Sequence, residues 1–118
     1  MKKETVSNNG ENSLYNEKWR PRFHFSAAKS WLNDPNGLVY FNGIYHLCYQ
    51  TIPDSYINNG DLHWGHATST DLIRWTEHPP VLYPDAVGKM WSGTSVVDHD
   101  DTSGFFDGGE GIDRKSVV

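Results

Sequence analysis

Residues 31–50, WLNDPNGLVYFNGIYHLCYQ, combine the turn residues and the strand pattern from which the fold is predicted. Its first part, WLNDPNG, holds the carboxylate of Asp34 next to a proline that biases the preceding residue toward an extended backbone. Asn36 and Gly37 tolerate positive φ, so the segment is predicted to be a tight turn just before a strand. Such a turn would aim Asp34 in one direction. An Asx-type turn with a solvated carboxylate is the alternative.

A β-hairpin is predicted immediately after this segment. Asn42 and Gly43 stand between two apolar runs, residues 37–41 and 44–50, and Asn-Gly in that place is the strongest short hairpin signal. Side chains alternate between the two faces of a strand. In the second run one face would carry Ile44, His46, Cys48 and Gln50, and the other Tyr45, Leu47 and Tyr49.

The rest of the chain continues this pattern of short apolar runs separated by turn residues. Further strands are predicted at residues 63–69, 73–77 and 91–98, with a tight turn capped by Asp71 and with loops at 53–61, at Pro79-Pro80 and at 84–88. No amphipathic helix of normal length is visible, so we expect an all-β protein. Four antiparallel strands and then a fifth are typical of one propeller blade followed by the inner strand of the next.

Composition narrows the class of protein. The net charge of −5 and the pI near 5.6 leave no basic surface for nucleic acid. A mean hydropathy of −0.65 and the lack of a long apolar run argue against a membrane span. Cys48 is the only cysteine, which excludes an internal disulfide and suits a small buried side chain.

The domain organisation is one flexible polar leader, residues 1–18, followed by one domain over residues 19–118. No secretory signal is visible, so we expect a cytoplasmic protein if Met1 is the natural start. The segment after Asp113 looks too polar for the apolar strand expected after Gly111, and we interpret it as a truncated or altered end.

No metal or other cofactor is expected. His63 and His66 are three residues apart, but in a strand that spacing sends them to opposite faces. The acidic residues Asp98, Asp100 and Asp101 lack the regular spacing and terminal Glu of a calcium loop.

Four blocks then carry a resemblance to a known family: WLNDPNG (31–37), CYQ (48–50), HWGHATS (63–69) and WSGT (91–94). Their order and spacing resemble the opening of glycoside hydrolase family 32, which contains invertases, sucrose-6-phosphate hydrolases, inulinases and levanases. The blocks DLIRW (71–75) and TSGFF (102–106) extend the resemblance across residues 19–109. It implies a five-bladed β-propeller with the active site in a funnel at its axis.

The resemblance also implies roles for particular residues. Asp34 matches the nucleophile of a retaining mechanism, which would attack a β-linked fructosyl unit and form a covalent intermediate. The residues that match substrate contacts are Asn33, Gln50, Trp64, Trp91, Ser92 and, beside the nucleophile, Trp31. Two of these have structural alternatives, since Gln50 can satisfy backbone groups and Trp64 can pack in the core. Trp91 stands where Phe is commoner in the family.

Retaining hydrolysis needs a second carboxyl group as acid/base. In the family this is the Glu of a Glu-Cys pair, and an Arg-Asp-Pro block steadies the sugar; the sequence contains neither. We therefore expect a β-fructofuranosidase fragment that acts on sucrose or fructans, is inactive alone and needs the remainder of the propeller as its partner. The alternatives are a non-catalytic carbohydrate-binding remnant and a related five-bladed arabinan- or xylan-acting glycosidase. Sucrose, sucrose 6-phosphate, inulin and levan stay open as substrates.

Overall fold

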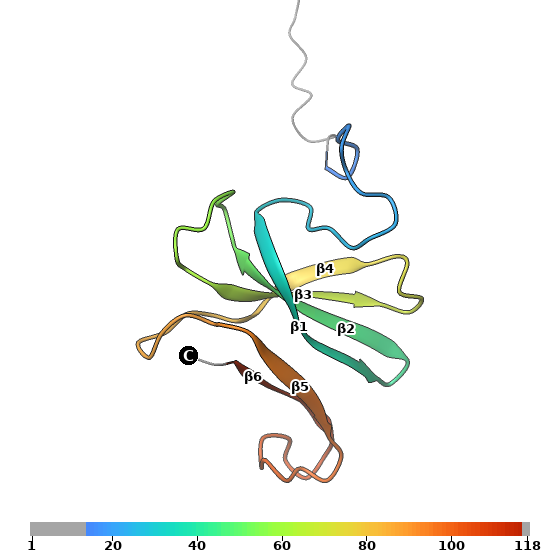
Figure 1. The fold of residues 1–118 in the computed structure, drawn as a ribbon. Coiled ribbons are helices and arrows are strands. Elements are labelled where there is room, and N and C mark those ends of the chain that lie inside the picture. The colour runs from blue at the N-terminus through green and yellow to red at the C-terminus, as the bar shows by residue number, and fades with distance from the viewer. Residues whose placement is uncertain (1–13, 117–118) are drawn as a thin grey trace, which may run out of the picture.

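The computed structural model describes residues 14–116, which form six strands and no helix (Figure 1). This confirms the all-β prediction. In chain order the strands are β1 (Trp31–Phe41), β2 (Ile44–Ile52), β3 (His63–Ser69), β4 (Thr76–Leu82), β5 (Gly93–Asp98) and β6 (Gly111–Ser116).

The strands form two antiparallel sheets. The first contains β1 to β4 in sequence order, and the second contains β5 and β6, with β5 packed beside β1 (Figure 1). The hairpin between β1 and β2 is the one predicted, because Asn42 and Gly43 both have positive φ, 49° and 81°. One complete blade and the first two strands of the next are therefore present.

The fourth strand lies further along the chain than predicted. It runs from Thr76 to Leu82 and includes Pro79 and Pro80, which the sequence pattern places in a loop. Its register with β3 jumps between His78 and Leu82, so the prolines lie where the ladder is interrupted on an edge strand. Proline lacks an N–H group and is tolerated at such places. The turn before β4 is capped as predicted, since Asp71 Oδ1 accepts hydrogen bonds from the backbone N–H of Ile73 and Arg74.

The second sheet corrects another expectation. Residues 111–116 form β6, which pairs with β5 along its whole length, from Gly93↔Ser116 to Asp98↔Gly111. The prediction was wrong because it required an apolar strand after Gly111. A β-ladder is formed by backbone hydrogen bonds, so the polar residues of β6 can pair with β5. β5 starts at Gly93, two residues later than predicted.

Two hydrophobic clusters occupy opposite faces of the first sheet, as the alternation along β2 predicted. One contains Leu47, Tyr49 and Ala67 with Phe25, Ala27 and Trp75 packed on it, and the other contains Cys48, Trp64 and Met90 with Val81 and Leu82. Cys48 is fully buried, and this burial raises the pKa of its thiol. It is therefore a core residue.

Glu77 on β4 joins the N-terminal segment to the sheet. Its carboxylate accepts hydrogen bonds from Tyr15 Oη at 2.6 Å, from the Ala28 N–H at 3.1 Å and from Tyr49 Oη at 3.2 Å. Residues 1–13 of the predicted leader lie outside the described residues, while the last part of it contributes Tyr15 to this contact. Within residues 14–116 there is no helix long and apolar enough to cross a bilayer.

Candidate functional site

The carboxylate of Asp34 lies within β1 and not in a turn before it, which corrects the prediction. The register passes from Leu32↔Thr51 to Pro35↔Tyr49, so three steps along β1 match two along β2. Such a β-bulge places Asn33 and Asp34 together opposite the single residue Gln50. The rigidity expected from a turn is thus supplied by a bulged strand at the edge of the first sheet.

Four of the predicted site residues form a hydrogen-bonded chain. Asn33 Nδ2 donates to Gln50 Oε1 at 3.4 Å, and Gln50 Nε2 donates to Ser92 Oγ at 3.3 Å. Ser92 Oγ in turn donates to Asp34 Oδ2 at 2.8 Å. Gln50 is only 2% exposed, whereas the other three residues face solvent. The chain therefore links a buried amide to an accessible carboxylate.

The close approach of β1 to β5 brings Ser92 to Asp34. Gly37 has a φ of +52°, and a Cβ built on it would overlap Ser95 Oγ and lie 3.2 Å from the Trp64 ring. Asn36 Oδ1 accepts a hydrogen bond from the Gly93 N–H at 3.4 Å, next to Ser92. Only glycine at this second irregularity of β1 lets the two sheets approach this closely.

The three predicted aromatic residues occupy different environments. Trp64 is completely buried, and its Nε1 donates to the Trp91 carbonyl oxygen at 2.8 Å, so within this chain it has the packing role that was the alternative to a funnel wall. Trp91 is 50% exposed and adjoins Ser92. Trp31 begins β1, and its backbone is tied by the Thr51 hydroxyl and the Ser55 carbonyl. Trp91 thus offers the most accessible ring.

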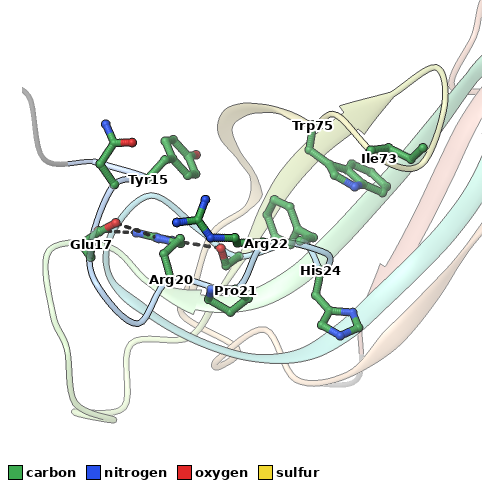
Figure 2. Close-up of a pocket in the computed structure, with 11 residues that line it drawn as sticks. Tyr15, Glu17, Arg20, Pro21, Arg22, His24, Ile73 and Trp75 are labelled. Atoms are coloured by element: carbon green, nitrogen blue, oxygen red, sulfur yellow. Dashed lines mark hydrogen bonds and ion pairs between the residues drawn. The ribbon is translucent and has the colours of Figure 1, made fainter.

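A cavity of about 370 Å³ lies elsewhere, between the N-terminal segment and the turn that precedes β4 (Figure 2). It contains none of the predicted site residues, and nothing in the sequence patterns singled it out. Arg20 on its wall is occupied structurally: it pairs with Glu17 and donates to the Ala27 and Ala28 carbonyls. The hydrogen bond from Arg20 lowers the pKa of Glu17 to about 2. The cavity is therefore separate from the Asp34 constellation.

Histidines cross the first sheet in a row, from His46 through His66 to His78. The rings of His46 and His66 are stacked, and that of His78 is tilted against His66. His63 is absent from this row, as its position on the opposite face of β3 predicts; its Nδ1 contacts the Asp61 carbonyl instead. Among residues 14–116, no group of three or more His, Cys, Asp or Glu side chains is placed to hold a metal ion.

Comparison with known proteins shows which family the chain resembles. A profile of the glycosyl hydrolases family 32 N-terminal domain matches residues 24–116. The chain is 53% identical over 92 residues to a fructan beta-fructosidase of Streptococcus mutans and 49% identical over 100 residues to a levanase of Bacillus subtilis. These matches cover 78% and 85% of this chain but only 6% and 15% of the two relatives, so the chain spans a small part of their length.

Solved structures of similar enzymes also match the fold of this chain. The chain superimposes with a TM-score of 0.70 on the exo-inulinase from Aspergillus awamori, at 44% identity, covering 77% of this chain and 18% of that one. A beta-fructofuranosidase from Schwanniomyces occidentalis complexed with fructosyl-erythritol matches with a TM-score of 0.69 and 44% identity, covering 80% of this chain and 18% of that one.

Proposed function

The chain belongs to glycosyl hydrolase family 32, and we propose that it supplies the nucleophile of a site that hydrolyses β-fructosyl linkages with retention of configuration. Asp34 is the nucleophile. The observation that carries this assignment is the constellation around it: an accessible carboxylate on a bulged strand, held by Ser92, which directly precedes β5 of the second sheet, and backed by Gln50. A fixed anion suits attack on a docked sugar, and Trp91, the residue before Ser92, is half exposed and so available to contact the sugar.

The first chemical step forms a bond between an Asp34 oxygen and the anomeric carbon of the fructosyl unit and breaks the bond from that carbon to the leaving-group oxygen. The leaving oxygen takes a proton from a second carboxyl group. Water then attacks the same carbon, gives its proton to that group, and releases fructose and the free Asp34 carboxylate.

The glutamates of residues 14–116 are all engaged away from Asp34. Glu17 pairs with Arg20, Glu77 accepts from Tyr15 and Tyr49, and Glu110 contacts His99. The proton donor of the proposed site therefore comes from another part of the complete propeller. General acid catalysis contributes about 10²- to 10⁴-fold, so residues 14–116 alone would show negligible hydrolysis.

Fructans and sucrose are the substrates that we propose. Support comes from the names of the similar proteins, a fructan beta-fructosidase and a levanase, and from the solved complex with fructosyl-erythritol. The exposed Asn33 amide and the Trp91 ring offer the polar and apolar contacts that a furanose needs.

A chimera tests the proposal. The 100 matched residues of the Bacillus subtilis levanase are replaced by those of this chain, and hydrolysis of levan, inulin and sucrose is measured. We expect fructose release by the chimera and a loss of at least about 10³-fold in kcat for Asp34→Asn. Circular dichroism checks that the parent chimera and its Asp34→Asn variant fold alike. An Asp34→Asn chimera that still hydrolyses levan at the parent rate would refute the assignment, and retained levan binding without any hydrolysis by the parent chimera would favour a binding remnant.

A further inference from the structure

The two carboxylate oxygens of Asp34 have different surroundings. Oδ2 accepts the hydrogen bond of Ser92, whereas no described residue between 14 and 116 donates to Oδ1. A carboxylate has two equivalent oxygens in solution, and only a neighbouring donor makes them unequal. One oxygen is thus occupied and the other is free.

In the hydrogen-bonded chain from Asn33 to Asp34, each donor points toward Asp34. The Asn33 amide nitrogen can only donate, and it fixes Gln50 Oε1 as an acceptor at 3.4 Å. Gln50 must then present its Nε2 to Ser92, and a hydroxyl that accepts from an amide directs its single proton elsewhere. The remaining polar neighbour is Asp34 Oδ2, at 2.8 Å.

From this arrangement we propose that Ser92 is a positioning residue for the nucleophile: it holds Oδ2 of Asp34, leaves Oδ1 as the attacking oxygen, and is itself oriented by Gln50. The inference rests on the proposed function, since it assigns an attacking atom to the same nucleophile. It gives Ser92 a role other than donating to a sugar hydroxyl, because its one proton is already used.

Because Gln50 is buried, the hydrogen bonds can run only in the observed direction, from Asn33 to Asp34. An amide that is 2% exposed cannot exchange its partners for water, so flipping it would face its oxygen toward the Ser92 hydroxyl and its nitrogen toward the Asn33 nitrogen. The flipped state leaves two donors face to face and draws the Ser92 proton away from Asp34. Hydrogen bonds to charged groups are stronger than neutral ones, which favours the observed direction.

The test uses the complete levanase chimera and separates kcat from KM on levan. Ser92→Ala is expected to lower kcat about 10- to 100-fold, with KM changed less than about threefold, because a bond to a charged group is lost. Ser92→Thr keeps the hydroxyl and should restore most of kcat. Gln50→Met keeps the volume but removes the amide, and should also lower kcat. The control Thr70→Ala removes an exposed hydroxyl just beyond the far end of β3 and should change neither constant.

A double-variant cycle examines whether Gln50 acts through Ser92. If it does, Gln50→Met combined with Ser92→Ala should be no slower than Ser92→Ala alone. If the losses in kcat of Gln50→Met and Ser92→Ala multiply in the double variant, Gln50 does not act through Ser92 and this part of the proposal is overturned. A change in KM alone would show that Ser92 only binds the sugar. An active parent chimera that is inactivated by Asp34→Asn but not by Ser92→Ala would refute the positioning role while sparing the proposed function.

A crystal structure of the chimera gives a readout that does not depend on activity. Ser92 Oγ within hydrogen-bonding distance of one Asp34 oxygen, with the other oxygen facing the sugar site, would support the proposal. A Ser92 hydroxyl turned to the sugar, with Asp34 lacking it as a donor, would overturn it even if the chimera were inactive.

Discussion

The imidazole rings of His46 and His66 lie nearly parallel, 5° apart, with His46 Nδ1 3.0 Å from His66 Nε2. His78 extends the row from β4, and its Nε2 contacts Thr68 Oγ1. Burial, followed by the positive charge of Arg114 on β6, lowers the pKa of both His46 and His66, and that of His66 falls to about 4. A proton on His46 or His66 would bring a positive charge close to Arg114, so the folded chain favours the neutral form of these two rings.

Acidification should destabilise the protein through this row. The unfolded chain binds a proton on His66 as the pH falls through 6.5, while the folded chain binds it only near 4, so stability is present above 6.5 and is lost as the pH falls toward 4. Allowing for partial solvent exposure, the loss is about 1–2 kcal/mol. Urea unfolding at pH 7.5 and 4.5 measures it.

The matched variants are His66→Gln and His63→Gln, both on β3. The first should flatten the pH dependence because the titrating group is gone, and the second should keep it because His63 lies outside the row. An equal slope in the wild type and in His66→Gln would contradict the assignment.

Gly37→Ala should destabilise the contact between the two sheets. The added methyl group meets Ser95 and Trp64 at a residue whose φ is +52°. Left-handed backbone costs an alanine about 1–2 kcal/mol, and overpacking adds about 1–3 kcal/mol. Gly43→Ala is the control, since its φ is +81° but nothing lies within 4 Å of the new Cβ. Thermal unfolding should show a larger loss for Gly37→Ala, and equal losses would mean that packing contributes nothing.

Glu77→Gln should loosen the N-terminal segment. Burial and the hydrogen bond to Glu77 raise the pKa of Tyr15 to about 12, so the neutral phenol is favoured and its stabilisation is lost as the pH rises from 10 through 12. Without the carboxylate, ultraviolet titration should show Tyr15 ionising at lower pH, and the Ala28 amide should exchange with deuterium faster. Tyr15→Phe identifies the titrating ring, and unchanged Ala28 exchange in Glu77→Gln would count against the anchor.

Trp64→Phe should weaken the start of β5 by removing the hydrogen bond from Nε1 to the Trp91 carbonyl. The unpaired group and the lost volume cost about 1–3 kcal/mol. In the chimera we expect lower kcat as well, because Ser92 follows Trp91 directly. Trp75→Phe is the matched control: this ring packs edge-on against Phe25 in the other cluster, so its loss should affect stability without reducing kcat. If kcat fell in Trp75→Phe but not in Trp64→Phe, the prediction for Trp64 would be contradicted.

Local chemistry was sufficient to predict several features from the sequence. The Asn42-Gly43 hairpin, the Asp71 cap and the two faces of β2 all depend on residues close together in the chain. The fourth strand was misplaced because Pro79 and Pro80 usually indicate a loop, and only the pairing partner shows that they lie at an interruption of the ladder on an edge strand. β6 was missed because its polar residues pair through backbone groups.

The sequence was enough to predict the candidate site residues, because the blocks around Asp34, Gln50 and Ser92 are distinctive without any knowledge of the fold. Their hydrogen-bonded connections became visible only in the folded chain. The bulge that sets Asn33 and Asp34 against Gln50 is a matter of register between strands, and the bond from Ser92 to Asp34 joins residues 58 positions apart through the contact of two sheets. Spacing along a chain does not specify either relationship, since both depend on how closely separate strands can approach.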